Sequence, residues 1–175
     1  ESAIITVPST VTLSDGTALV GAESELTNTA GGAAIGVGTG TGLTVALASD
    51  TPSSGIVVKN SARAPFTKVN LTASSDGDIV IDSLVILRGG VGSDGAFSSL
   101  AVIDTATTEQ IGLDKTLNSD HEANLNDDIT IKAGTTKTLL LAGNMVARAT
   151  MASYAGEAPA LCLKSVTLSG SVTIT

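Results

Sequence analysis

Residues 4–13 read IITVPSTVTL, a stretch in which mostly apolar positions alternate with mostly threonine positions. A side-chain period of two is typical of a β-strand with one buried face. Pro8 donates no ladder hydrogen bond, so we expect this strand at a sheet edge or split into two pieces. One face carries Ile5, Val7, Ser9, Val11 and Leu13; the other carries Ile4, Thr6, Pro8, Thr10 and Thr12.

Similar strand patterns continue along the chain. Turn signals recur about every 8 to 12 residues, the spacing typical of an antiparallel sandwich. Residues 18–27 fit either a short helix or a strand, and the glycine-rich segment 36–42 fits either a closely packed strand or a loop. We expect a loop at 89–95, and strands at 43–48, 55–59, 65–73, 78–88, 99–104, 108–113, 128–132, 136–147, 161–168 and 172–175.

Composition supports an all-β fold. The chain has 175 residues, of which 42% are hydrophobic and only 2% aromatic, so its core is built from small branched side chains that suit stacked sheets. We predict an antiparallel β-sandwich, immunoglobulin-like or jelly-roll-like, with an N-terminal extension strand. Residues 1–13 form that extension, and residues 14–175 form a single sandwich domain.

The charge balance excludes several partners. Nine basic residues stand against 17 acidic ones, and a net charge of −8 repels nucleic acid and anionic membranes. No run approaches the roughly 18 apolar residues of a membrane span. The chain begins at Glu1 without Met, which fits either a mature exported protein or an arbitrary boundary. We expect an extracellular or cell-surface protein.

Residues that carry chemistry are scarce. The chain has one histidine and one cysteine. Cys162 lies in the apolar run 160–163, which predicts a small buried side chain. Ser119, Asp120 and His121 are adjacent in sequence, so their side chains diverge and cannot form a catalytic relay. We therefore predict that the protein is not an enzyme and has no catalytic residues.

Acidic side chains offer the best metal ligands. Ca²⁺ takes six to eight oxygen ligands, and clustered acids on loops provide them. The spacing does not match the EF-hand pattern, and the same acids also suit solvated loops and Asx turns. Both interpretations are open, with calcium as the only cofactor considered. The calcium ligands would be Asp76, Asp78, Asp120, Glu122, Asp127 and Asp128.

Four segments resemble a domain of large cell-surface proteins of Parcubacteria-type and related bacteria. They are 52–58 (PSSGIVV), 64–73 (APFTKVNLTA), 117–120 (LNSD) and 129–139 (ITIKAGTTKTL). Domains of that kind place the AGTTKTL turn between two antiparallel strands of an immunoglobulin-like sandwich. The resemblance implies that fold and a cell-surface setting, and it implies no catalytic residues.

The N-terminal strand leads to our main functional hypothesis. A sandwich with an extra amphipathic strand suggests a subunit of an extracellular filament, pilus or tube, polymerising with itself by strand donation. The donor contacts would be Ala3, Ile5, Val7, Val11 and Leu13. The same segment also fits the first strand of its own domain. The alternative function is an adhesin or surface-layer module that binds a surface glycan or a cell-wall partner.

Overall fold

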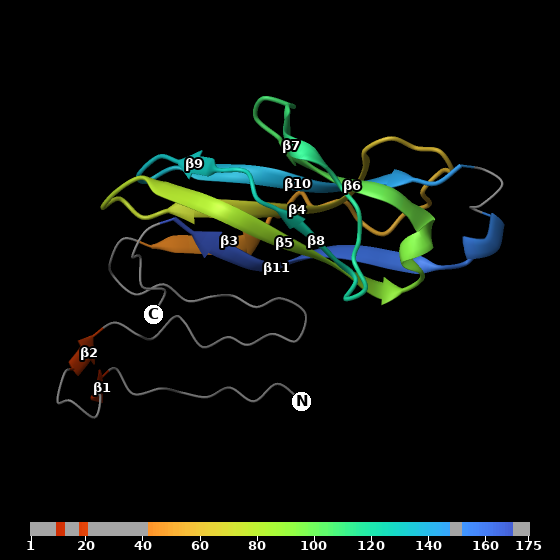
Figure 1. Ribbon diagram of the computed structural model, residues 1–175. Helices are drawn as coiled ribbons and strands as arrows, with labels where there is room; N and C mark the ends of the chain where they lie inside the picture. The colour runs from red at the N-terminus through yellow and green to blue at the C-terminus, as the bar shows by residue number, and fades with distance from the viewer. Residues whose placement is uncertain (1–9, 13–17, 21–41, 148–151, 170–175) are drawn as a thin grey trace.

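Two antiparallel sheets packed face to face make up the protein, as the computed structural model shows for residues 10–12, 18–20, 42–147 and 152–169 (Figure 1). The larger sheet has the strand order β3-β4-β10-β6-β7, and the smaller has the order β11-β5-β8, with β9 also pairing with β5. Only two short 3₁₀ helices, Asp94–Ala96 and Ala152–Tyr154, interrupt the strands in the described residues. The all-β sandwich predicted from the sequence is confirmed.

The strands of the sandwich occupy most of the described chain. Their bounds are β3 Leu43–Leu47, β4 Ala64–Ala73, β5 Ile79–Val91, β6 Phe97–Asp104, β7 Gln110–Lys115, β8 Glu122–Leu125, β9 Ile129–Ile131, β10 Thr136–Met145 and β11 Ala158–Leu168.

The core lies between the two sheets and follows the period-two pattern of the strands. Its fully buried aliphatic side chains come from both sheets, as sandwich packing requires. The largest of them are Leu71, Ile81, Leu84, Ile86, Leu100, Leu125, Ile131, Leu139, Leu141 and Leu161.

The long strand β5 contains a break in its alternation. Ile79 and Ile81 are buried, but the next buried residue is Leu84. The pairing of β5 with β11 shifts register at the same place, which leaves Asp82 as the extra residue of a β-bulge. On the other side of β5 the partner strand is divided into β8 and β9, one on each side of the bulge.

Three local expectations from the sequence are wrong. Residues 55–59 form no strand, although their apolar side chains resemble one. The acidic segment 118–128, which we read as loop, contains the short strand β8. Residues 89–91, expected as a loop, continue β5. Gly90 adopts φ +74°, and a Cβ there would lie 2.4 Å from the Ala158 carbonyl oxygen, so this part of the strand requires glycine. The glycines at this point permit close packing of two strands.

The AGTTKTL turn is present, but it joins different sheets. The Thr135 N–H donates to the Lys132 carbonyl at 3.0 Å, and Gly134 takes φ +68°. The strand before the turn is β9 of the smaller sheet, and the strand after it is β10 of the larger one. The turn therefore connects the two layers.

The described N-terminal residues form a separate two-stranded sheet. β1 (Thr10–Thr12) pairs antiparallel with β2 (Ala18–Val20), with Val11 opposite Leu19. The undecided segment 18–27 thus begins as a strand. The expected donor contacts Ala3, Ile5, Val7 and Leu13 lie outside the described residues, as do segment 36–41 and the expected strand 172–175.

Candidate functional site

An open groove runs between the edges of the two sheets. One wall is β11 of the smaller sheet, and the other is β4 with β3 of the larger sheet. Its volume of about 1750 Å³ exceeds the roughly 300–1,000 Å³ of small-molecule pockets. We call it the edge groove; its lining residues are 45–47, 51–59, 61–67, 69, 96, 145 and 155–163. The dimensions suit an extended peptide segment better than a compact ligand.

The edge groove exposes large apolar side chains. Ile56 is 98% exposed, Leu47 is 67% exposed and Val58 is 63% exposed. In the described chain these are three of the five exposed large hydrophobic residues, the others being Val91 and Leu113. Scattered apolar residues are normal on a surface, but a gathered patch is typical of an interaction site.

The β11 wall presents a strand edge that has no strand partner among the residues that the structure describes. Arg88 of β5 donates its backbone N–H to the His121 carbonyl, on the side of β5 away from β11. Leu161 is opposite Arg88 in the register, so its own backbone groups turn to the open side of β11. Pro159, two residues earlier, faces the same way and has no N–H to leave unsatisfied. On this side the Leu161 carbonyl accepts a side-chain hydrogen bond from Thr67, so further strand pairing would use the backbone groups beyond Leu161.

The opposite wall is also incompletely paired. β3 pairs with β4 only over residues 69–73, and the Lys68 backbone bonds instead to Ala48 and Thr51. Before that point, residues 64–67 have no strand partner on this side within the described structure. At the base of the edge groove, Thr67 Oγ1 donates to the Leu161 carbonyl at 2.6 Å. This bond ties the two walls together.

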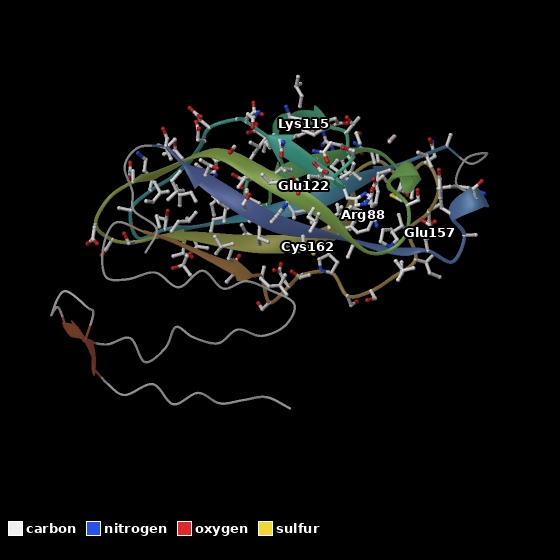
Figure 2. The ribbon with its side chains drawn as sticks, turned by 60° about the horizontal axis from the view of Figure 1, so that its bottom comes forward. Arg88, Lys115, Glu122, Glu157 and Cys162 are labelled. Carbon is white, nitrogen blue, oxygen red and sulfur yellow. The ribbon has the colours of Figure 1, made fainter. Side chains whose placement is uncertain are left out.

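Cys162 lies on the β11 wall and is exposed, so the prediction of a buried cysteine is wrong. Figure 2 shows its position on β11. Its neighbour Leu161 is fully buried, and adjacent side chains of a strand point to opposite faces. The Cys162 Sγ lies 3.9 Å from where a Cβ on Gly89 would be, which places the thiol over β5 on the outer face.

The six acids proposed as calcium ligands are dispersed. Asp78 accepts hydrogen bonds from Lys132 Nζ at 2.6 Å and from the Ala133 N–H at 3.0 Å, and these two bonds lower the pKa of its carboxyl. Glu122 forms an ion pair with Lys164. No group of three or more His, Cys, Asp or Glu side chains in the described residues could hold a metal ion.

The remaining four acids are also spread over the surface. Asp76, Asp120 and Asp128 are exposed. Asp127 packs across Gly112 of β7, where an added Cβ would lie 2.1 Å from Asp127 Oδ2. The calcium site stays a prediction that this geometry does not support.

A charged cluster fixes the loops near the start of β11. Asp94 Oδ1 accepts from Arg88 Nε at 2.7 Å, and Asp94 Oδ2 lies 2.6 Å from His121 Nδ1. Partial burial raises the pKa of Asp94, but the hydrogen bonds with His121 and Arg88 outweigh it and leave that pKa lowered. Close by, Glu157 Oε2 accepts from the Ser93 N–H at 2.7 Å. Figure 2 shows Arg88 and Glu157 at this end of the sandwich.

His121 therefore contacts Asp94 rather than its sequence neighbour Asp120. Its contact with Asp94 links β5, the 3₁₀ helix 94–96 and the turn before β8. The cluster holds these elements together, and every partner in it is satisfied by another residue of the same chain. The non-catalytic expectation stays a prediction.

Comparison of the chain with protein-family models, with curated proteins and with solved structures returns no match. Within the described ranges, no helix has the length and apolar character needed to cross a membrane. The class that the structure defines is a two-sheet antiparallel β-sandwich.

Sequence reasoning did not find the edge groove. Its walls come from residues about 100 positions apart, between β4 and β11, and no local pattern brings them together. The signal that was available is the apolar run 56–58. It was read as a strand because a periodic apolar pattern does not tell buried side chains from exposed ones.

Proposed function

We propose that this protein is the structural subunit of an extracellular filament, pilus or tube, polymerising by β-strand donation between subunits. The observation that carries the proposal is the edge groove, an apolar channel flanked by two incompletely paired sheet edges. Strand addition uses main-chain hydrogen bonds for affinity and alternate side-chain pockets for specificity. The edge groove supports the proposal because sheet edges that have no strand partner in the described chain lie there beside exposed apolar side chains.

The donor in this proposal is the segment 3–13, whose apolar positions include Ile5, Val7 and Val11. A contact in which one subunit gives a strand and another receives it is head to tail, so it does not close and builds a filament. The finer resemblance, to domains of bacterial cell-surface proteins, agrees with an extracellular location.

A direct test compares the full chain with a chain lacking residues 1–13. Purified without any partner, the full chain is expected to form filaments or tubes in negative-stain electron microscopy. The truncated chain is expected to remain as isolated particles with an unchanged far-UV circular dichroism spectrum. Isolated particles from the full chain, or filaments from the truncated one, would contradict the proposal.

A matched pair of full-length variants separates donation from simple loss of chain. Val7→Asp combined with Val11→Asp places two charges on the apolar face of the segment. Thr6→Asp combined with Thr10→Asp places the same two charges on the opposite face. Burying an unpaired carboxylate is costly, so only the first variant should fail to assemble.

A second function, an adhesin or surface-layer binding module, is favoured by a polar hollow of about 470 Å³ beside β7. Asp114 accepts there from Ser99 Oγ at 3.0 Å, Asn144 Nδ2 at 2.8 Å and Gln110 Nε2 at 2.8 Å. Amides and carboxylates of this kind also bind sugar hydroxyls. Binding of the monomeric chain to a glycan array, lost on Asp114→Ala, would support this alternative.

A further inference from the structure

We infer that the edge groove is the acceptor site, and that residues 3–13 of a second copy of this chain occupy it as a strand added to the open edge of β11. This inference rests on the proposed function and gives it a location. Donation by itself does not say which of the sheet edges receives the strand.

The length of the segment matches the wall that would receive it. Residues 3–13 are eleven residues long, and β11 is also eleven residues long. A strand rises about 3.3 Å per residue, so each spans roughly 36 Å. The segment is therefore long enough to reach along the open edge of β11, with pairing interrupted at Pro8 and at the Leu161 carbonyl, which is bonded to Thr67.

The chemistry of the segment matches the lining. Residues 2–13 contain no charged side chain, so inserting them buries no unpaired charge. Alternate apolar side chains, such as Val7 and Val11, suit a strand that turns one face to the interior. The edge groove offers that interior the exposed side chains of Leu47, Ile56 and Val58.

The other sheet edges are poorer acceptors. β8 and β9 are four and three residues long, and the bulge of β5 separates them. β7 is only six residues long, and its Gly112 takes φ +64°. β11 also has register shifts in its pairing with β5, but it is eleven residues long. Short or irregular edge strands disfavour the addition of a further strand. The open edge of β11 is the longest of the described sheet edges, and the exposed apolar side chains of the edge groove lie beside it.

A second copy is favoured over the donor's own sandwich. Within one chain, β1 pairs with β2 in a two-stranded sheet of its own and with neither wall of the edge groove. A strand has two hydrogen-bonding edges, and this hairpin uses only one edge of residues 10–12. Among the described residues, no strand pairs with the other edge of residues 10–12.

The first experiment places one charge in the edge groove. Ile56→Asp changes a side chain that is 98% exposed, so the monomer should fold as before. Leu113→Asp is the matched control, since Leu113 is 77% exposed on β7, outside the edge groove. We expect Ile56→Asp to reduce the pelletable polymer about tenfold or more, because the new carboxylate would be buried by the incoming strand. Leu113→Asp should polymerise like the unmodified chain.

The second experiment uses Cys162, the single cysteine of the chain, as a fixed reporter on the β11 wall. Cysteines are introduced one at a time at residues 4, 6, 10 and 12, which share a face, and at residues 5, 7, 9 and 11, which share the other. A disulfide requires Cα atoms within about 7 Å, so it forms only between closely apposed positions. We expect oxidised filaments to give a ladder of covalent multimers from one of these faces alone, and none with Cys162→Ala.

The outcomes separate this inference from the proposed function. Filaments that form normally with Ile56→Asp, or that give no multimers with any introduced cysteine, would show strand donation to another acceptor and would overturn the inference alone. A disulfide formed within a monomer would overturn the second-copy assignment. A full-length chain that never forms filaments would overturn both. Loss of polymer with Ile56→Asp but not Leu113→Asp, together with covalent multimers, supports the acceptor assignment.

Discussion

Thr67 Oγ1 donates a hydrogen bond of 2.6 Å to the carbonyl of Leu161, and this bond joins β4 of one sheet to β11 of the other. The two residues are 94 positions apart in the sequence. Leu161 is fully buried, and its carbonyl lies on the side of β11 that has no strand partner in the described structure. The bond therefore satisfies an edge carbonyl at the place where the two layers meet.

Replacing Thr67 by valine should destabilise the sandwich by about 1 kcal/mol, because it leaves the Leu161 carbonyl without its donor. Urea denaturation measures the free energy of unfolding. Thr72→Val is the control on the same strand, since Thr72 Oγ1 bonds to Thr136 Oγ1 at an exposed position. Its effect should stay within about 0.5 kcal/mol. Equal losses in the two variants would contradict a special role for the Thr67 bond.

Gly143 lies beneath both phenylalanines of the chain, Phe66 and Phe97, whose ring centroids are 5.3 Å apart. A Cβ on Gly143 would lie 2.6 Å from Phe97 Cε1 and 2.9 Å from Phe66 Cε2. Gly143→Ala should therefore cost about 1–3 kcal/mol by overpacking. Thermal unfolding followed by circular dichroism would measure the loss.

Two controls for Gly143→Ala test the overpacking explanation: one adds a methyl group where there is space, and the other replaces a neighbouring ring by a smaller side chain. Gly55→Ala adds the same methyl group where the nearest atom is 3.8 Å away, and it should be nearly neutral. Adding Phe66→Leu to Gly143→Ala should recover part of the stability, because the smaller side chain makes room. Strict additivity of the two losses would mean that the rings do not cause the effect.

Asp104 is a buried acid, and Lys137 Nζ lies 2.5 Å from its Oδ2. Burial raises the pKa of Asp104, but the hydrogen bonds from Lys137 and from the Ala106 N–H outweigh it and leave that pKa lowered. A pKa that is lower in the folded than in the unfolded chain contributes stability above the unfolded value of about 3.9. That contribution is lost as the pH falls through the folded pKa.

The free energy of unfolding is expected to decrease as the pH falls below about 4. This decrease should be less steep in Asp104→Asn. At neutral pH the same variant should be less stable by about 2 kcal/mol, since a charged hydrogen bond is lost. Urea titrations at several pH values would measure both effects. Asp128→Asn, at an exposed position between β8 and β9, is the control and should follow the unmodified chain.

The thiol of Cys162 should react with an aromatic disulfide reagent in the folded monomer, because the residue is exposed. The reaction without denaturant is expected to reach completion, with a rate within about tenfold of that in urea. Absorbance of the released thiolate measures it. A reaction that proceeds only after unfolding would show that the thiol is covered in the monomer.

The sequence predicts the strands well where one face is buried. β4 alternates from Val69 to Ala73, and β6 and β10 contain short continuous apolar runs at 100–103 and 139–142, so their local patterns agree with their buried environment. Cys162 was misplaced although it follows the same alternation. Leu161 and Cys162 are both apolar, and the pattern did not say which of them faces the core.

The candidate site was much harder to predict, because it depends on which strands become edges. The strand β8 lies in an acid-rich segment that resembles a loop in the sequence, and its pairing with β5 is what makes it a strand. Ile56 resembles a buried strand residue in the sequence, but it lies outside the strands and is 98% exposed at the edge groove. Pairing between distant strands decides which segments become strands and which side chains are buried. No short stretch of sequence specifies this pairing.

The division of the smaller sheet's far strand into β8 and β9 has a consequence for growth. The bulge at Asp82 leaves that side with two short pieces, while β11 on the near side is eleven residues long. In the proposed polymer, a subunit that accepts a strand at one edge alone would bind its neighbours in a single row. The bulge would therefore disfavour strand addition at β8 and β9 in that polymer and leave β11 as the edge that accepts a neighbour.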